Sequence, residues 1–216
     1  MEGGTGGHVF PALAVARELR ERGWKIVWMG TRQGMESRLV PQAGFDMEWI
    51  TVGGLRGKGV GTLLWAPFRL VRAVTQAIAI VRRLRPATVL GMGGFAAGPG
   101  GMASWLLRRP LVIHEQNAIA GMTNVMLSRL AVRVCSAFPT TLAAHKPVTV
   151  TGNPVRREIA ALAPPAERFR DRTGPLRLLV VGGSLGAQAL NEMVPLAIAG
   201  WAAEFRPQIW HQTGEK

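Results

Sequence analysis

The sequence has a single cysteine, no tyrosine and few acidic residues. Cys135 has no second thiol to pair with, which excludes a disulfide framework and a cysteine-based zinc site and fits a reducing compartment. Only 13 Asp and Glu residues stand against 26 Lys and Arg, which gives a formal net charge of +13 at pH 7. This imbalance favours an anionic partner: nucleic acid, an anionic membrane face or a phosphorylated substrate.

The chain also lacks a secretory signal and a long uninterrupted apolar run. Its longest apolar stretch, residues 63–81, is broken by Pro67, Arg69 and Arg72, so a spanning helix is not expected. Any association with a membrane would therefore be with its surface. With 216 residues, 48% of them apolar, the chain can hold one large α/β domain, or one domain and part of a second.

Glycine, by contrast, is plentiful and is concentrated in three turns. They span residues 3–8, 93–100 and 182–187, and at least the last two directly follow a short apolar run. Without a Cβ atom, backbone N–H groups can approach an anion closely, and a helix that starts after the turn adds the positive end of its dipole. One such turn would be weak support, but three favour a diphosphate ligand.

Apolar runs and helical patterns alternate as in a doubly wound α/β fold with parallel strands. Helices are expected at 12–22, 35–43, 63–84, 100–107, 121–130 and from 187, and strands at 25–29, 47–52, 88–91, 111–114, 132–135, 149–151, 176–181 and 208–211.

The same pattern predicts two Rossmann-like domains. We expect the first at 1–155, a Pro-rich and charged linker at 156–175, and the start of a second at 176–216. Only two residues precede the first glycine turn, so the first domain is expected to lack its first strand. The second contains a single βαβ unit and is expected to be truncated.

Six motifs, in order, resemble those of the MurG family of peptidoglycan N-acetylglucosaminyltransferases. They are GGTGGHVFPA at 3–12, GGLRGKG at 53–59, GMGGF at 91–95, HEQN at 114–117, GNPVR at 152–156 and GGSLGA at 182–187.

The resemblance implies a two-domain transferase of the GT-B type. Such an enzyme moves N-acetylglucosamine from UDP-N-acetylglucosamine to the muramyl 4-hydroxyl of lipid I, the undecaprenyl-diphosphate-linked acceptor, to give lipid II with inversion. The first domain would bind the acceptor and the second most of the nucleotide. No cofactor or metal is implied. Residues expected to complete the donor site would lie beyond Lys216, so we expect little or no turnover from this chain alone. Another GT-B UDP-sugar transferase is the alternative.

The resemblance places several residues at the donor. They are Thr5, Gly6 and Gly7 of the first turn, Asn117, Arg156 at the domain junction, and Ser184 of the third turn. Backbone N–H groups and hydroxyls can hold a sugar diphosphate, a guanidinium can clamp a phosphate or sugar hydroxyl, and a helix start can stabilise the departing UDP without a metal.

His8 is the candidate general base. An imidazole at this turn could accept the proton of the acceptor hydroxyl during transfer. It could equally hydrogen-bond to the loop or bind phosphate. His114 and Glu115 lie at the C-terminal end of a predicted strand, and we favour a structural role for both in holding the loop.

The resemblance assigns the second glycine turn to the acceptor diphosphate, through Gly93, Gly94 and Gly98, with a helix that begins near Pro99. Family members often carry a tyrosine where Phe95 stands and a serine near Ala97, so a hydroxyl contact is absent here. A backbone contribution would remain.

A basic and apolar segment follows the second motif. Leu64, Trp65, Phe68, Arg69 and Arg72 could form an interfacial patch, with the aromatic rings in the headgroup layer and the guanidinium groups facing anionic lipid. An ordinary core-facing helix is the alternative, and the polyprenyl acceptor favours the membrane. The expected location is the cytoplasmic side of the inner membrane, as a peripheral protein.

Two other classes of protein fit the chain less well. A nucleic-acid-binding module would suit the charge, but no recognition motif is present and the basic residues are spread along the chain. A dinucleotide-dependent oxidoreductase would need an acidic residue after the strand that ends at Met29-Gly30, where none stands.

Overall fold

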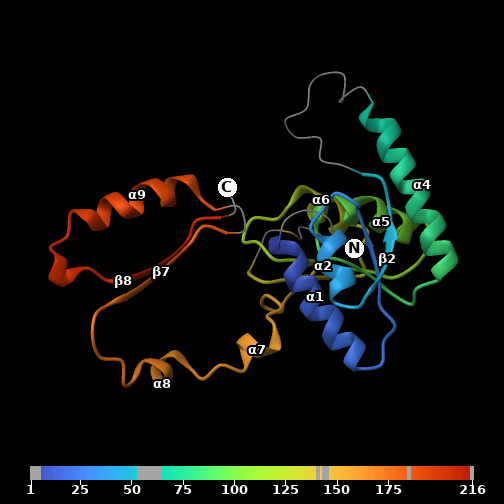
Figure 1. The fold of residues 1–216 in the computed structure, drawn as a ribbon. Helices are drawn as coiled ribbons and strands as arrows, with labels where there is room; N and C mark the ends of the chain where they lie inside the picture. The colour runs from blue at the N-terminus through green and yellow to red at the C-terminus, as the bar shows by residue number, and fades with distance from the viewer. Residues whose placement is uncertain (1–5, 53–64, 140–141, 143–145, 184–185, 215–216) are drawn as a thin grey trace. The chain divides into compact units, whose positions relative to one another are not determined.

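We analysed a computed structural model of the chain, which describes residues 6–52, 65–139, 142, 146–183 and 186–214. The described chain forms two compact units, Met1–Ala160 and Ala161–Lys216 (Figure 1). The first unit contains the helices α1 Gly6–Glu21, α2 Glu36–Gln42, α4 Ala66–Leu84, α5 Gly94–Leu106, α6 Met122–Ser128 and α7 Arg157–Ala160. Its strands are β1 Val27–Gly30, β2 Asp46–Trp49, β3 Val89–Gly91, β4 Leu111–Glu115, β5 Arg133–Ser136 and β6 Val148–Val150.

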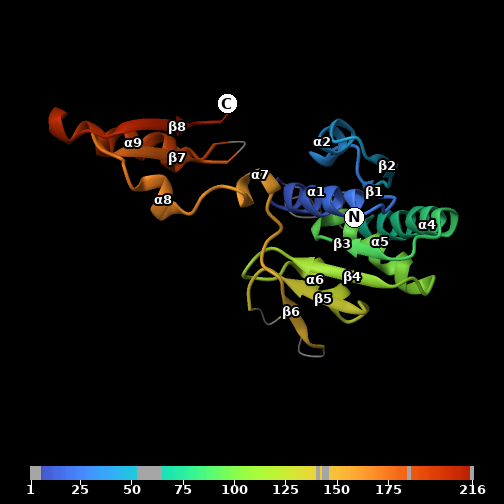
Figure 2. The ribbon, with the colours of Figure 1, turned by 90° about the horizontal axis from the view of Figure 1, so that it is seen from below.

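All strand pairs of the first unit are parallel, as expected of the α/β class. β1 pairs with β2, and a four-stranded sheet has the order β3-β4-β5-β6, which Figure 2 shows side by side. Its register places Val89 opposite Leu111 and His114 opposite Cys135. β4 is almost continuously buried, as is typical of a parallel strand covered on both faces. Because these strands are parallel, the loops after β3, β4 and β6 leave the sheet at the same edge.

Helix α5 is rich in small residues, which allow it to pack against its neighbour α6. Its sequence contains four glycines and three alanines, and seven of its residues are buried. A Cβ atom added at Gly101 would lie 2.6 Å from a methyl carbon of Leu127 in α6. The second half of α5 can therefore pack against the end of α6 because position 101 carries no side chain.

Two helices begin earlier than the sequence predicts. α1 begins at Gly6 instead of Ala12, and α5 begins at Gly94 instead of near Pro99 or Gly100. Because glycine has low helix propensity, the sequence predicts both starts after the glycines, but tertiary packing of α5 overrides that preference. Gly93 precedes α5 with φ of 87°, a left-handed conformation that glycine adopts without the Cβ penalty.

Helix α4 shows how a helix and its end follow from the sequence. Ala73, Ala77, Ile80 and Val81 form its buried stripe, at the spacing of one helical face. Arg85 then takes a left-handed conformation with φ of 45° and Pro86 follows, which ends the helix. In the described part of the chain, no helix is long and apolar enough to cross a membrane.

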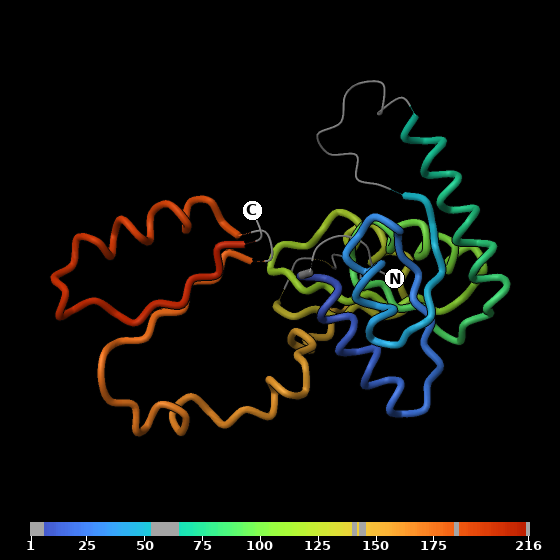
Figure 3. Tube along the Cα trace, in the orientation of Figure 1, coloured from blue at the N-terminus to red at the C-terminus, as the bar shows by residue number. Residues whose placement is uncertain are grey.

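The second unit contains α8 Pro165–Phe169, β7 Arg177–Val181, α9 Gln188–Ala199, the 3₁₀ turn η1 Ala203–Phe205 and β8 Gln208–Gln212. β7 and β8 are parallel, with Leu178 opposite Ile209. Figure 3 traces the path along β7, back through α9 and again along β8. The predicted strand, helix and strand are therefore present, although α9 buries no residue.

Candidate functional site

Four segments far apart in the sequence meet at the carboxyl edge of the β3–β6 sheet. The side chain of Gln116, directly after β4, connects them. Its Nε2 donates a hydrogen bond to the carbonyl of Met92 (2.9 Å), and its Oε1 lies 3.3 Å from Nδ1 of His8 in α1. Its backbone carbonyl accepts a hydrogen bond from Nδ2 of Asn153 (3.2 Å). Residues of the first, third, fourth and fifth motifs thus form one site, at the sheet edge where open α/β folds bind ligands.

Glu115 holds the loop between β4 and α6. Its carboxylate accepts hydrogen bonds from the backbone and side-chain nitrogens of Asn117 (2.9 and 3.0 Å), from the amide of Gly121 (3.1 Å) and from Nδ2 of Asn124 (2.8 Å). Burial pushes the pKa of Glu115 upwards, but these hydrogen bonds outweigh burial and hold it below its ordinary value. The carboxylate is therefore ionised and fully occupied as a structural anchor, the role we favoured for this residue.

His114 is likewise engaged with the protein. Its Nε2 donates to the carbonyl of Gly152 (3.1 Å), so the unprotonated nitrogen is Nδ1, which is buried and has no hydrogen-bond partner in the described structure. Burial lowers the pKa of His114 despite this hydrogen bond and the nearby charge of Glu115. The ring stays neutral and connects β4 to the segment after β6.

The second glycine turn presents fewer residues to a ligand than expected. Since α5 begins at Gly94, the N–H groups without a partner inside the helix are those of residues 93–96. Gly98 lies in the second turn of α5, where its own N–H bonds within the helix, and a Cβ there would lie 3.7 Å from Thr123. The backbone contribution predicted for Gly98 therefore does not fit this helix start, whereas Gly93 and Gly94 stand at it.

The predicted donor residues divide into those the structure describes and those it does not. Thr5 and Ser184 lie outside the described residues, while Gly6 and Gly7 form the first turn of α1. Asn117 is exposed, and its Nδ2 is turned towards Glu115, which leaves Oδ1 as the acceptor that a ligand can reach. Arg156 lies over the ring of Phe10 in α1, 5.7 Å from its centroid.

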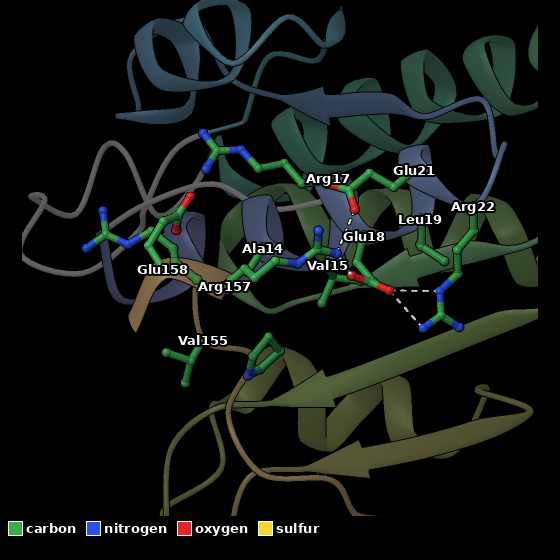
Figure 4. A pocket seen from close by; sticks show the side chains of 12 residues that line it. Ala14, Val15, Arg17, Glu18, Leu19, Glu21, Arg22, Val155, Arg157 and Glu158 are labelled. Atoms are coloured by element: carbon green, nitrogen blue, oxygen red, sulfur yellow. Dashed lines mark hydrogen bonds and ion pairs between the residues drawn. The ribbon is translucent and has the colours of Figure 1, made fainter. Parts of the chain in front are cut away.

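A groove of about 460 Å³ lies beside the C-terminal half of α1, away from His8 (Figure 4). Arg157 crosses it to Glu18 (2.9 Å) and Glu21 (2.6 Å), and Arg22 also pairs with Glu18 (2.8 Å). The hydrogen bonds from Arg22 and Arg157 lower the pKa of Glu18. These four side chains are exposed and pair with one another, although Arg17 and Arg156 also line the groove. Exposed ion pairs of this kind contribute little, and the groove lies away from the His8–Gln116 contact, so it is not the candidate site.

The predicted membrane patch is exposed where the structure describes it. Trp65 is 62% and Phe68 is 68% exposed, and their ring centroids lie 5.5 Å apart. Arg69 and Arg72 are exposed on the same helix, and Leu64 lies outside the described residues. The core-facing stripe of α4 begins only at Ala73, so an ordinary core-facing role does not account for the start of this helix.

Sequence reasoning singled out the HEQN motif but missed the central role of Gln116. It also missed Asn153, which binds the Gln116 carbonyl. The motif contains two neighbouring amides, and only Asn117 matches a donor position of the resembling family. The one available signal was the position of Gln116 directly after a predicted buried strand. Within the described residues, no group of three or more His, Cys, Asp or Glu side chains is arranged so that it could hold a metal ion.

Several known proteins are similar to this chain in sequence. Residues 1–136 match the glycosyltransferase family 28 N-terminal domain. Over all 216 residues the chain is 56% identical to the UDP-N-acetylglucosamine--N-acetylmuramyl-(pentapeptide) pyrophosphoryl-undecaprenol N-acetylglucosamine transferase of Nitrosococcus oceani, and 57% identical to the protein of the same name from Cupriavidus necator. It covers 60% of each relative, so the chain spans about three fifths of their length.

A crystal structure of Acinetobacter baumannii MurG has the same fold. It is 42% identical in sequence, with a TM-score of 0.79 over the whole of this chain and 60% of that protein. The expected α/β fold of the GT-B type is thereby confirmed for the part that the two proteins share.

Proposed function

Because the chain belongs to glycosyltransferase family 28 through its N-terminal domain, we propose that it acts in an inverting N-acetylglucosaminyltransferase. The donor is UDP-N-acetylglucosamine and the acceptor is the muramyl 4-hydroxyl of lipid I, and the product is lipid II. One observation carries the proposal: His8, Gln116, Asn153 and the N–H groups of the β3–α5 turn meet at one sheet edge. The names of the relatives support the choice of substrates.

In the proposed reaction, the imidazole of His8 removes the proton of the acceptor hydroxyl. The hydroxyl oxygen forms a bond to the anomeric carbon while the bond from that carbon to the β-phosphate oxygen breaks on the opposite face. The electron pair leaves with UDP, and inversion follows. A positioned base of this kind contributes roughly 10² to 10⁴-fold to the rate.

The acceptor diphosphate would bind at the start of α5. The N–H groups of residues 93–96 have no partner inside the helix, and the positive end of the helix dipole attracts an anion. Gly93 and Gly94 keep this surface free of side chains. On the donor side we assign contacts to Thr5, Gly6, Gly7, Asn117, Arg156 and Ser184.

The transfer of radiolabelled N-acetylglucosamine to a lipid I analogue tests the proposal. The N. oceani relative, with its matching segment replaced by residues 1–216 of this chain, is expected to form the lipid II analogue. In this chimaera His8→Ala is expected to lower kcat by at least about 100-fold, and Arg22→Ala, in the exposed groove, to leave it unchanged. A chimaera that folds and binds UDP without transferring sugar would overturn the proposal. Transfer only to an acceptor without the muramyl sugar would favour a different UDP-sugar transferase.

We further propose that the start of α4 holds the protein on an anionic membrane surface, at the cytoplasmic face of the inner membrane. The exposed rings of Trp65 and Phe68 stand beside the cationic Arg69 and Arg72, a combination typical of interfacial helices. Sedimentation with phosphatidylglycerol vesicles is expected to fall when Trp65 and Phe68 are both replaced by serine. Trp201→Ser, at another exposed tryptophan (45%), is the control. Equal loss in both variants would contradict the assignment.

A further inference from the structure

We infer that Gln116 is a positioning residue that holds His8 in the tautomer with the proton on Nδ1, so that Nε2 is the nitrogen that accepts a proton. The inference rests on the proposed role of His8 as the base. It concerns a residue that contacts neither sugar nor phosphate in that proposal, and it specifies which atom of His8 reacts.

The orientation of the Gln116 amide follows from its partner. A backbone carbonyl can only accept a hydrogen bond, so the group 2.9 Å from the Met92 oxygen must be the amide nitrogen. The amide oxygen then necessarily faces His8, at 3.3 Å from Nδ1. Gln116 is only 5% exposed, and a reversed amide would place two oxygens against each other in a buried site.

The amide has little freedom to move. The Gln116 carbonyl is bound by Asn153, and the preceding Glu115 carboxylate is held by four hydrogen bonds. On the other side, the ring of His8 lies against Gly93: a Cβ atom there would be 3.1 Å from both Cε1 and Nδ1. The imidazole therefore sits between a fixed acceptor and a glycine backbone.

The tautomer follows from this geometry. The oxygen of an amide only accepts, so Nδ1 of His8 must donate, and the lone pair of the neutral ring then lies on Nε2. Among the described residues none forms a hydrogen bond with Nε2, and the ring is half-buried. Nε2 is thus the available acceptor for the proton of a hydroxyl group. Without Gln116, we expect the neutral ring of His8 to carry its proton mainly on Nε2, as the imidazole of a free histidine does.

Nitrogen NMR of the histidine rings tests the inference directly. The ¹⁵N-labelled chain is recorded by two-bond ¹H–¹⁵N correlation at a pH above the ordinary titration range of imidazole, where the neutral form dominates. The His8 signals are identified by their loss in His8→Gln. The expected pattern is a protonated Nδ1 and an unprotonated Nε2. A protonated Nε2 in the unaltered chain would overturn the inference.

Two substitutions separate positioning from general support of the fold. Gln116→Leu removes the acceptor and is expected to shift the His8 signals towards the Nε2–H form. Gln116→Glu keeps an acceptor for Nδ1 and, when protonated on its other oxygen, still donates to the Met92 carbonyl, so it is expected to retain Nδ1–H. Gln76→Leu removes a glutamine that instead bonds to Thr51 and should leave the His8 signals unchanged. Unchanged His8 signals in Gln116→Leu would also contradict the inference.

The transfer assay then distinguishes this inference from the proposed function. In the chimaera, Gln116→Leu is expected to lower kcat by about 10²-fold, as loss of a correctly placed base would, with the KM for the donor unchanged and partial rescue by Gln116→Glu. The NMR result needs no substrate. If the chimaera transfers no sugar, the function fails while the tautomer assignment stands; if transfer occurs with Nε2 protonated, only the inference fails.

Discussion

The turn after β3 and the turn after β7 are built from similar sequences but sit in different surroundings. Each places glycines between a parallel strand and a helix, and Gly93 and Gly183 have nearly the same φ, 87° and 82°. Seven residues of α5 are buried, whereas α9 buries none. The local sequence is therefore enough to predict the strand and the helix on either side of such a turn. Side chains are held in fixed positions beside it only where residues distant in the sequence pack against it.

The largest difference in stability between the two regions is expected when a carboxylate is removed from each. Glu115→Ala removes the buried acceptor of four hydrogen bonds in the β4–α6 loop, one of them from the buried Asn124, so we expect it to lower the free energy of unfolding of the first unit by about 3 kcal/mol. Glu192→Ala in α9 removes one exposed hydrogen bond with Gln188 and is expected to change it by less than about 0.5 kcal/mol. Urea unfolding, with hydrogen exchange to localise the effect, measures both. Equal losses of stability in the two variants would show that the two turns are held equally by their surroundings, contrary to this comparison.

A pair of glycine substitutions compares how tightly the two turns are constrained. Gly183→Ala meets no atom within 4 Å, so it adds only the left-handed strain of about 1 kcal/mol. Gly93→Ala places a Cβ on a residue with φ of 87° and ψ of −168°, a region essentially confined to glycine, and also presses on the His8 ring, so we expect a larger loss, near 2 kcal/mol. Protection of amides in β3 and β7 reports the two losses separately. A larger loss at Gly183 would show that the turn after β7 is the more constrained.

Acid should destabilise the first unit through His114 and Glu115. Burial lowers the pKa of His114 in the folded chain, so below its unfolded value of 6.5 the unfolded state binds the extra proton. The pKa of Glu115 is also lowered, so its contribution is present above 4.5 and is lost as the pH falls through its folded pKa. The free energy of unfolding should thus decrease on acidification, by at most about 1.4 kcal/mol per pH unit for each proton.

Urea titrations at a series of pH values check this dependence. His114→Gln keeps an N–H donor but does not titrate. It should therefore make the free energy of unfolding less dependent on pH just below 6.5, where the unfolded chain would otherwise bind a proton at His114. A slope unaffected by this substitution would place the titrating group elsewhere.

Much of the fold could be predicted because its strands are short, apolar and bounded by glycine or proline. β4 and β7 were placed within one residue of their observed bounds, since continuous apolar runs have a strong strand signal. The start of α5 was misplaced because its glycines favour a turn locally, and their packing against α6 involves residues more than 20 positions away. Helix propensity does not contain that information.

The site was predictable in its motifs but not in its contacts. The sequence indicates that His8 and the HEQN motif belong together only through the resemblance. The hydrogen bond between His8 and Gln116 joins positions 108 residues apart, and nothing local decides which of two adjacent amides faces inwards. The orientation of Asn117 also depends on the fold, because its side-chain nitrogen bonds to the carboxylate of Glu115, which the fold buries.

The place of Cys135 gives the protein a built-in reporter. This thiol is the only one in the chain, and it lies in β5, paired between His114 of β4 and Thr149 of β6. Burial raises its pKa although Arg133 is near, so little of the reactive thiolate form exists at neutral pH. Alkylation, counted as one mass increment per molecule, would therefore time the opening of the sheet that carries the site, without any label being introduced.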